Sequence, residues 1–595
     1  MCSAMTLKGG GTLLPPRSHP VQMPGHSDIR SGVLPSWDPT EQTDASNAFP
    51  QLGSQEGIIC RLQRKCSLFL PVDFIFRKRR TDFLENTMTF RPLLTVLVLL
   101  LPAGAPAQIS AEAETAAAIA RIEKLNPQIH AVIAVDPDAL AQARALDRMR
   151  TARGPLFGLP ILIKDNIESK GSMPTTAGSL ALKNNVTGRD APLVERLRAA
   201  GAVIVGKTNL SEWANIRSSA SISGWSAVGG QTRNPFALDR NPCGSSSGSG
   251  AAVAAGMVSA SIGTETDGSI TCPASINGIV GLKPTVGLVS RTHIVPISHS
   301  QDTAGPMTKD VRTAARVLAA IAGSDAADAA TRDADAHKTD YVAALDASAL
   351  KGKRIGVLRF AAGWSAPVDA LFEHALEVLK AQGAMLVEIK EFEDRQRIGK
   401  EEVKVLHTEL KADLNAYLAT TPAAVRTRTL AQIIAFNKEN DVTEMALFGQ
   451  ETFEKAEATK GLDDPDYRAA RALSFQMAGP GGIDRMLAAN DVVALVFPTM
   501  PPAWKIDAVN GDQISGSGAG DLAAVAGYPH LTVPMGAVKR LPVGLSFVGT
   551  AWSEARLLGL GYAYEQAAKV RLVPGMIPSI EDAPEILKHL QPAEK

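Results

Sequence analysis

Three consecutive serines lie in a run of small residues that leads directly into an alanine-rich stretch. The run reads Asn241-Pro-Cys-Gly-Ser245-Ser-Ser-Gly-Ser-Gly250, and residues 251–256 are Ala-Ala-Val-Ala-Ala-Gly. An alanine-rich stretch favours a helix, and a Gly/Ser loop before it offers hydroxyl groups and free backbone N–H groups in one place. A flexible linker has a similar composition but rarely leads into a helix-forming run. The pattern therefore indicates a polar site at a helix N-terminus.

A further serine lies 24 positions after Ser245, at the end of Gly263-Thr-Glu-Thr-Asp-Gly-Ser269. Between the two serines, residues 249–264 predict a helix and then a strand. A helix of about ten residues rises ~15 Å, and a strand of about five residues covers nearly the same distance back. Ser269 is therefore expected to return to the neighbourhood of Ser245. Consecutive N–H groups around Gly268 could then face a developing negative charge.

Lys164 follows directly after the apolar run Leu159-Pro-Ile-Leu-Ile163, which predicts a buried strand. A lysine at a strand end is usually solvated. Near two serines, a buried lysine can act as a general base. Burial favours the neutral amine, and a neutral amine can accept a proton near neutral pH. Together with Ser245 and Ser269, Lys164 is therefore a candidate general base.

Helical and strand-like segments alternate from residue 111 onward. Helices are predicted over 112–125, 137–153 and 192–200, the first of them ending at Asn126-Pro127. Strands are predicted over 159–163, 202–205, 354–358, 385–389 and 492–497. Because the connecting loops are short, we predict an α/β fold with a single large mixed, mainly parallel β-sheet sandwiched by helices. Charged helical stretches near 392–418 and 443–476 are expected to form a peripheral cap that selects substrates.

Residues 88–107 have the pattern of a secretory signal peptide. Arg91 provides a positive lead, residues 93–101 form a run of nine mostly apolar residues, and the segment ends in Ala105-Pro-Ala107. The run is shorter than the ~20 residues that a membrane span needs. Because a signal peptide must begin near the N-terminus, we expect translation to start at Met88. Residues 1–87 would then be a non-native, disordered extension.

Processing after residue 107 would place the enzyme outside the cytoplasm, in the periplasm or secreted. The mature domain, residues 108–595, would have 595 − 107 = 488 residues. If residues 88–107 instead form a buried strand or helix of the folded domain, the protein is expected in the cytoplasm. The signal-peptide interpretation is the one that the Ala-Pro-Ala ending favours.

Composition excludes several other classes of protein. The 595 residues are 45% hydrophobic and 21% charged, with 61 Lys+Arg balanced by 61 Asp+Glu. A large buried core is therefore possible, and no excess of positive charge points to nucleic acid. The five cysteines are too few and too scattered for a disulfide framework or a zinc site, and processing would leave Cys243 and Cys272. We predict a soluble mature enzyme without stable membrane insertion.

The three motifs resemble those of the amidase signature hydrolases. Gly158-Leu-Pro160 with Lys164-Asp165 is similar to that family's lysine motif, residues 243–249 to its Gly/Ser motif, and residues 263–269 to its nucleophile motif. The resemblance runs from roughly residue 112 to residue 570. Flanking pieces in the same order agree with it: Gly206-Lys-Thr-Asn-Leu-Ser-Glu-Trp213, Gly281-Leu-Lys-Pro284, Asp302-Thr-Ala-Gly-Pro306 and Gly527-Tyr-Pro529.

This resemblance implies a Ser-cisSer-Lys triad. Ser269 would attack an amide carbonyl and form an acyl-enzyme, Ser245 would relay a proton to the leaving ammonia or amine, and a neutral Lys164 would be the base. The Gly244–Ser245 peptide bond would be cis, and Ser246 would be structural. The oxyanion hole would consist of the backbone N–H groups of Thr266, Asp267, Gly268 and Ser269.

Two positions depart from the family's pattern. Cys243 stands where the Gly/Ser motif usually has a first glycine, and cysteine lacks glycine's freedom at positive φ. Thr271 stands where many members carry arginine, so any substrate contact of that arginine is absent. In this respect the chain is more similar to the bacterial peptide amidases than to the fatty-acid amide hydrolases.

The resemblance implies an amidase that converts a carboxylic amide, including the C-terminal amide of a peptide, into an acid and ammonia or an amine. It implies no metal and no cofactor, and its partner is the small-molecule or peptide amide. One alternative is a glutaminase like the A-type subunit of glutamyl-tRNA amidotransferase, and another is a non-catalytic binding protein on the same fold. His293, His299 and His530 lie near the motifs and are interpreted as hydrogen-bonded structural residues.

Overall fold

The computed structural model describes residues 110–149, 153–570 and 572–592. The predicted extension, 1–87, and the predicted signal peptide, 88–107, lie outside the described residues. Within the described residues, every helix is too short or too polar to cross a membrane.

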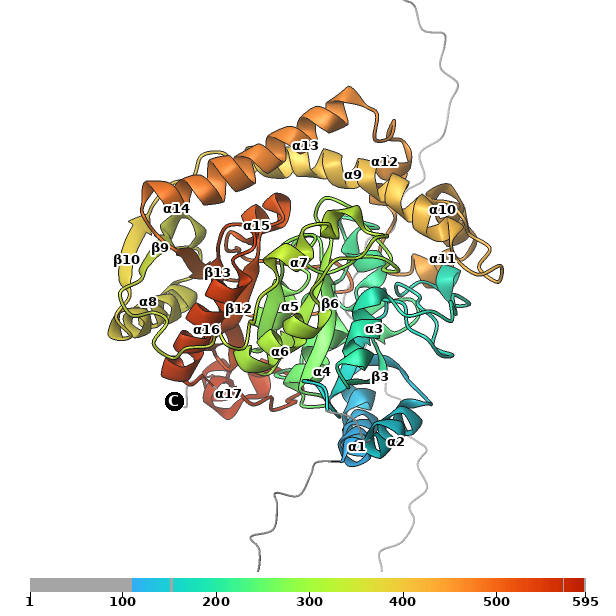
Figure 1. The fold of residues 1–595 in the computed structure, drawn as a ribbon, viewed down its shortest axis with the longest axis horizontal. Helices are drawn as coiled ribbons and strands as arrows, with labels where there is room; N and C mark the ends of the chain where they lie inside the picture. Colours follow the sequence, from blue (N-terminus) through green and yellow to red (C-terminus); the bar gives the residue numbers. More distant parts are fainter. Residues whose placement is uncertain (1–109, 150–152, 571, 593–595) are drawn as a thin grey trace, which may run out of the picture. The chain divides into compact units, whose positions relative to one another are not determined.

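An 11-stranded sheet runs through the described part of the chain (Figure 1), in the order β1-β3-β2-β6-β8-β7-β12-β13-β11-β9-β10. Its strands are β1 (Val132–Val135), β2 (Pro160–Lys164), β3 (Val203–Thr208), β6 (Ala260–Glu265), β7 (Val280–Lys283), β8 (Thr303–Thr308), β9 (Arg354–Leu358), β10 (Met385–Ile389), β11 (Ala494–Pro498), β12 (His530–Val538) and β13 (Leu541–Val548). Strands β4 (Trp225–Ser226) and β5 (Gly230–Gln231) form a separate pair. Parallel pairings join β2 to β3 and β6, and β9 to β10 and β11, whereas the remaining pairings are antiparallel.

Helices cover both faces of this sheet, so the predicted α/β architecture is confirmed. The helices of the N-terminal half are α1 (Ala111–Ile129), α2 (Ala139–Arg148), α3 (Pro192–Ala199), α4 (Ser247–Ala254), α5 (Thr271–Ile276) and α6 (Val311–Ile321). Those that follow are α7 (Ala334–His337), α8 (Ala366–Ala381), α9 (Arg395–Ala419), α10 (Leu430–Glu439), α11 (Asp441–Glu444), α12 (Glu451–Glu457), α13 (Pro465–Ala478), α14 (Arg485–Ala489), α15 (Gly520–Ala526), α16 (Glu554–Ala568) and α17 (Pro584–Leu590).

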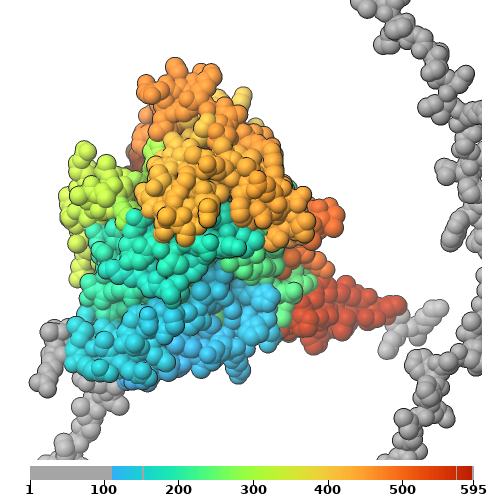
Figure 2. Space-filling model, turned by 90° about the vertical axis from the view of Figure 1, so that its right-hand side faces the viewer, coloured from blue at the N-terminus to red at the C-terminus, as the bar shows by residue number. Residues whose placement is uncertain are grey.

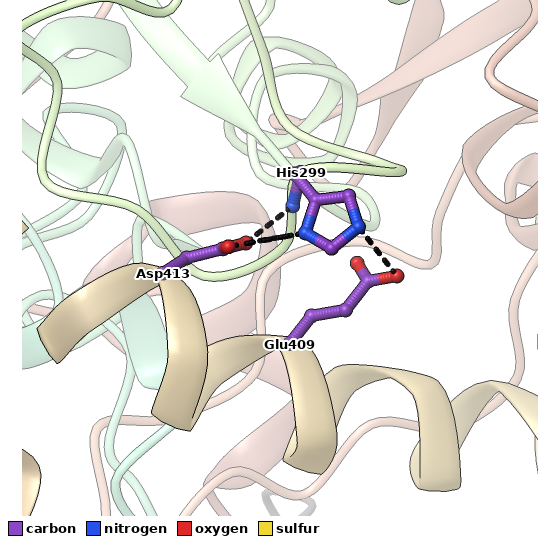
Figure 3. Close-up of side chains that lie close together, drawn as sticks. All are labelled: His299, Glu409 and Asp413. Atoms are coloured by element: carbon purple, nitrogen blue, oxygen red, sulfur yellow. Dashed lines mark hydrogen bonds and ion pairs between the residues drawn. The ribbon is translucent and has the colours of Figure 1, made fainter. Parts of the chain in front are cut away.

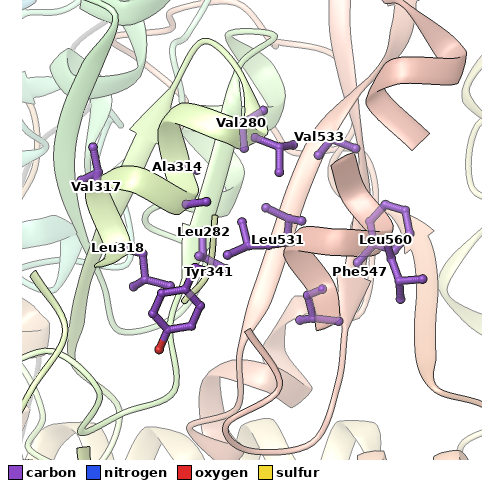
Figure 4. Close-up of a cluster of buried hydrophobic side chains, with 14 of the residues drawn as sticks. Val280, Leu282, Ala314, Val317, Leu318, Tyr341, Leu531, Val533, Phe547 and Leu560 are labelled. Carbon is purple, nitrogen blue, oxygen red and sulfur yellow. The ribbon is translucent and has the colours of Figure 1, made fainter. Parts of the chain in front are cut away.

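The two faces of the sheet bury separate hydrophobic clusters. Figure 4 shows part of the larger cluster, in which Leu318 of α6 packs with Leu282 of β7 and Leu531 of β12. On β2, Ile161 and Ile163 belong to this cluster, whereas the residue between them, Leu162, packs on the other side with α1 and α4. Alternate side chains of a strand point to opposite faces. A strand that is buried on both faces must therefore be continuously apolar, which explains the run that predicted β2.

The end of α1 differs from the prediction. The helix continues past Pro127 to Ile129. Proline removes one backbone donor but does not prevent the following turn. The helix ends at His130, which adopts a left-handed conformation and donates its N–H to the Asn126 carbonyl at 2.8 Å. The Asn126 side chain also forms two 2.8 Å hydrogen bonds with the backbone of Val132, so the residue predicted to end the helix organises the turn after it.

The segments near 392–418 and 443–476 form helices on one side of the sheet. Helix α9 occupies most of the first segment, whereas the second is divided between α11, α12 and α13. Figure 1 shows α9 and α13 side by side, and in Figure 2 these yellow and orange segments lie on the green-blue segment around residues 175–220. Several hydrogen bonds join the layers. For example, Leu180 N–H donates to Glu444 at 2.7 Å, and Arg217 donates to the Gly449 carbonyl at 3.1 Å. A role in substrate selection stays a prediction.

Candidate active site

Neighbouring strands and one helix N-terminus bring the three candidate residues to the same place. Lys164 is the last residue of β2, which pairs in parallel with β6, and Ser269 follows β6 in the turn before α5. Ser245 lies two residues before the start of α4, the helix predicted after the serine run, and Ser246 is the N-cap residue of that helix. Lys164 and Ser245 are fully buried, and Ser269 is 8% exposed. The helix and strand between the serines have the order that their spacing predicted.

Lys164 contacts Ser245 directly. Its Nζ lies 2.7 Å from Ser245 Oγ, 2.9 Å from Thr264 Oγ1 and 3.3 Å from the Thr264 carbonyl oxygen. A neutral amine has two N–H donors and one lone pair, so it can donate to Thr264 while it accepts from the Ser245 hydroxyl. Burial lowers the pKa of Lys164 to about 7, against the opposing effect of the carboxylates of Asp302 and Glu265. The resting amine can therefore act as a base near neutral pH.

Ser246 joins the two serine-bearing segments. Its N–H donates to the Ser269 carbonyl at 3.2 Å, and its hydroxyl donates to the Thr264 carbonyl at 3.1 Å and accepts the Thr264 N–H at 3.2 Å. The Gly244–Ser245 peptide bond is cis, as predicted. A Cβ atom on Gly244 would lie 2.1 Å from Ser211 Oγ, so a larger residue at this position would collide with its neighbour.

The turn that ends in Ser269 presents backbone donors. Within the described chain, the N–H groups of residues 266–269 are not donated to any other protein group. The N–H groups of the next two residues, Ile270 and Thr271, donate to the Glu265 carboxylate at 2.7 and 2.9 Å, which fixes the end of the turn. Asp302 accepts the Thr266 hydroxyl at 2.6 Å and holds its beginning. This arrangement can stabilise an oxyanion with donors that are already oriented.

A cavity of about 280 Å³ lies beside this turn. Its lining includes Gly244, Asp267, Gly268 and Thr271 from the two serine-bearing segments, together with Arg395 of α9. The Asp267 side chain is exposed at the cavity. Loss of hydration beside the surrounding protein, together with the nearby Glu402, Asp521 and Glu265 carboxylates, raises the pKa of Asp267. Arg395 pairs with Asp521 of α15 at 3.0 Å. The cap helix thus forms part of the cavity wall.

His299 contacts two carboxylates of the same cap helix (Figure 3). It lies three residues before Asp302, which holds the beginning of the turn that ends in Ser269. The two carboxylates belong to α9: His299 Nδ1 lies 2.9 Å from Asp413 Oδ2, and His299 Nε2 lies 3.4 Å from Glu409 Oε1. Candidate metal-ligand atoms of these three residues lie within 4.8 Å of one another. However, Glu409 also accepts the hydroxyls of Ser300 and Tyr467 at 2.7 Å, so the geometry favours a hydrogen-bonded anchor for α9.

Of the three histidines near the motifs, His299 and His530 are hydrogen-bonded as predicted, whereas the prediction is wrong for His293. His299 carries the anchor just described, and its pKa is raised by the hydrogen bond to Asp413. His530 is buried, and its Nε2 lies 2.7 Å from Ser546 Oγ. Burial and the neighbouring Lys283 lower the pKa of His530 to about 3, so this ring is neutral at physiological pH. The ring of His293 carries no hydrogen bond among those of the described residues.

Sequence reasoning missed a disulfide at the centre of the site. Cys243 and Cys272 form a disulfide across 29 residues, with their Cα atoms 6.1 Å apart. Both cysteines line the 280 Å³ cavity. The prediction that five scattered cysteines form no disulfide framework did not consider a single bond. The available signal was that these two cysteines alone would remain after processing and that each lies close to a candidate catalytic serine.

Comparisons with known proteins place these features in context. The family model described as Amidase matches residues 113–558. The chain is 40% identical over 470 residues to a probable amidase of Arabidopsis thaliana, covering 77% of this chain and 86% of that protein. It is 39% identical over 486 residues to the A-type subunit of the glutamyl-tRNA(Gln) amidotransferase of Roseiflexus castenholzii, with coverages of 77% and 93%. The solved peptide amidase of Stenotrophomonas maltophilia is 50% identical, with a TM-score of 0.74 and coverages of 79% and 96%.

Proposed function

Since the chain belongs to the amidase family and is an amide-hydrolysing enzyme, we propose that it forms an acyl-enzyme on Ser269, with Ser245 as proton relay and Lys164 as base. The observation that carries this proposal is the 2.7 Å contact between the Lys164 amine and the Ser245 hydroxyl, in a site where burial lowers the pKa of the lysine to about 7. The same contact favours catalysis over a non-catalytic binding protein, because binding alone does not require a lysine amine held against a serine hydroxyl.

In the reaction that we propose, each of these groups has one role. Lys164 Nζ accepts the Ser245 proton while Ser245 Oγ accepts the Ser269 proton, and Ser269 Oγ attacks the amide carbonyl. The N–H groups of residues 266–269 stabilise the resulting oxyanion. The proton held on Lys164 returns through Ser245 to the leaving nitrogen, and the C–N bond breaks to release ammonia or an amine. A water molecule, deprotonated by the same relay, then attacks the acyl-enzyme, and the acid leaves as Ser269 regains its proton.

The substrate that we propose is a peptide with a C-terminal amide. The 50% identity to a peptide amidase supports this class. The cavity beside Gly268, with a volume of about 280 Å³, has room for a residue at the scissile carbonyl. Thr271 replaces the arginine that many family members carry, so it provides no fixed positive charge for a free carboxylate of the substrate. A peptide amide needs no such charge.

A glutaminase of the amidotransferase type is the second candidate, because the chain shares 39% identity with one such amidotransferase component. Ammonia release separates the two. Purified enzyme is supplied in turn with peptide amides, free glutamine and simple aliphatic amides, with Ser269→Ala as the inactive control. We expect the highest kcat/KM for peptide amides. A preference for glutamine would favour the glutaminase, and no release from any of the three would refute the proposed hydrolysis of these amides.

We further propose that the enzyme works outside the cytoplasm. The segment 88–107 supports export by its charge, apolar run and small-residue ending. The disulfide between Cys243 and Cys272 supports it independently, because disulfides persist in oxidising compartments and are rare in the cytosol.

A further inference from the structure

The disulfide joins the two segments that carry the candidate catalytic serines. Cys243 lies two residues before Ser245, and Cys272 lies three residues after Ser269. We propose that this bond is a positioning element of the active site, which holds Ser245 within reach of Ser269, so that full activity belongs to the oxidised enzyme. The inference rests on the proposed roles of the two serines.

The backbone of Cys243 explains why a restraint is needed there. Its φ is 57°, in the left-handed region that glycine adopts freely and other residues adopt rarely. Asn241 Oδ1 accepts the Cys243 N–H at 2.7 Å, and the Cys243 carbonyl accepts the Ser247 hydroxyl at 2.6 Å. The chain must keep this conformation to enter the Gly244–Ser245 bond. The disulfide supplies a covalent restraint that a glycine at this position would not need.

Buried hydrogen bonds also join the two segments. They include those of Ser246, whose side chain is fully buried, to Ser269 and to Thr264. The disulfide instead lines the cavity, and each cysteine is 5% exposed. The Cys243 segment is therefore held from both sides. The Ser211 N–H also donates to the Ser245 carbonyl at 3.0 Å, so loss of the disulfide would loosen the segment on its cavity side without releasing it. The Ser245 hydroxyl could then shift away from Lys164 and Ser269.

Reduction has a defined chemistry. A dithiol such as dithiothreitol transfers two electrons and two protons to the bond, leaving thiols on Cys243 and Cys272 and a cyclic disulfide in the reagent. The exchange begins with attack by a thiolate on one sulfur, and the slight exposure of both cysteines toward the cavity gives a small reductant a route to them. Oxidation reverses the change, so that activity is coupled to the redox state of the compartment.

The test compares four forms of the mature enzyme: oxidised wild type, wild type reduced with dithiothreitol, Cys243→Ala/Cys272→Ala and Cys243→Gly/Cys272→Ala. Maleimide labelling of denatured protein, read by intact mass, counts the free thiols. We expect reduction and the double alanine exchange each to lower kcat for a peptide amide at least tenfold while KM changes less than threefold. The glycine variant should recover to within about threefold of wild type, because glycine adopts the left-handed conformation without help.

The glycine variant also controls for the reagent, because dithiothreitol should not change its rate. The proposal is overturned if reduced wild type, with two thiols counted, keeps its kcat, or if the alanine and glycine variants lose activity equally. Should the alanine variant fail to fold, as judged by circular dichroism, reduction and reoxidation of wild type decide the question. An oxidised wild type without amidase activity would instead refute the proposed function, so the two failures are distinguishable.

Discussion

The pH dependence of the reaction follows directly from the environment of Lys164. Only the neutral amine can accept a proton, so kcat/KM should track the neutral fraction of this residue. Burial disfavours the charged form and sets the pKa at about 7. The rate should therefore rise with pH and level off above pH 8. With that pKa, about half of the enzyme is active at pH 7, about a tenth at pH 6 and about a hundredth at pH 5.

A substitution at Asp302 tests the physical cause of this pKa. The Asp302 carboxylate raises the pKa of Lys164, and burial raises the pKa of Asp302 itself to about 6, so it carries its charge at neutral pH. Asp302→Asn removes that charge, and the acidic limb of the profile should move to lower pH. Asp512→Asn is the control, because Asp512 lines the 280 Å³ cavity but is not a cause of the shift in the pKa of Lys164.

The assay is ammonia release from a peptide amide between pH 5 and pH 9 at constant ionic strength, fitted for the midpoint of the acidic limb. The variants are compared by the midpoint pH of the acidic limb and not by the rate at the plateau. Asp302 also accepts the Thr266 hydroxyl, so its substitution will lower the plateau rate as well. A rate that stays constant between pH 5 and pH 8 would refute the neutral-lysine base. A limb that moves to higher pH in Asp302→Asn would refute the electrostatic argument.

Four further outcomes are expected. Alanine at any member of the triad should remove most of kcat, with double variants little worse, as steady-state kinetics will show for Lys164, Ser245 and Ser269. Ser246→Ala should cost less, since it joins segments and transfers no proton. Gly244→Ala would place a Cβ atom 2.1 Å from Ser211 Oγ and should lower the free energy of unfolding by about 1–3 kcal/mol in urea, whereas no loss would contradict the packing. N-terminal sequencing of native protein should give a terminus near Gln108 in the extracytoplasmic fraction, and a cytosolic chain that starts at Met1 would contradict export.

The strands that are buried on both faces were predictable from the sequence. Such burial requires continuous apolar runs, and β2 and β9 coincide with such runs to within a residue. The edge strand β10 also coincides with its predicted range, although most of its residues are exposed or half-buried. The order and direction of the strands in the sheet could not be predicted from the apolar runs. Antiparallel pairs such as β12 with β13, or β6 with β8, depend on contacts between segments that local periodicity does not record.

The candidate site was predictable in its reacting groups and not in their support. Lys164 and Ser245 carry functional groups at recognisable positions in motifs, and the structure brings them together. The residues that tune and hold them come from elsewhere in the chain. Asp302 reaches Thr266 across 36 positions, and Glu409 of α9 reaches Ser300 across 109. Such contacts form between distant segments only in the folded protein, so a single sequence motif does not predict them.

The most direct test of the account is to locate the nucleophile chemically. The mature enzyme is treated with a fluorophosphonate, which reacts with activated serines, and the modified peptide is identified by tandem mass spectrometry in wild type, Ser269→Ala and Lys164→Ala. The account predicts one adduct on Ser269, none in Ser269→Ala, and a rate of labelling at pH 8 that is lower by at least tenfold in Lys164→Ala. An enzyme that hydrolyses amides but is labelled at another residue, or one labelled at Ser269 equally fast without Lys164, would contradict it.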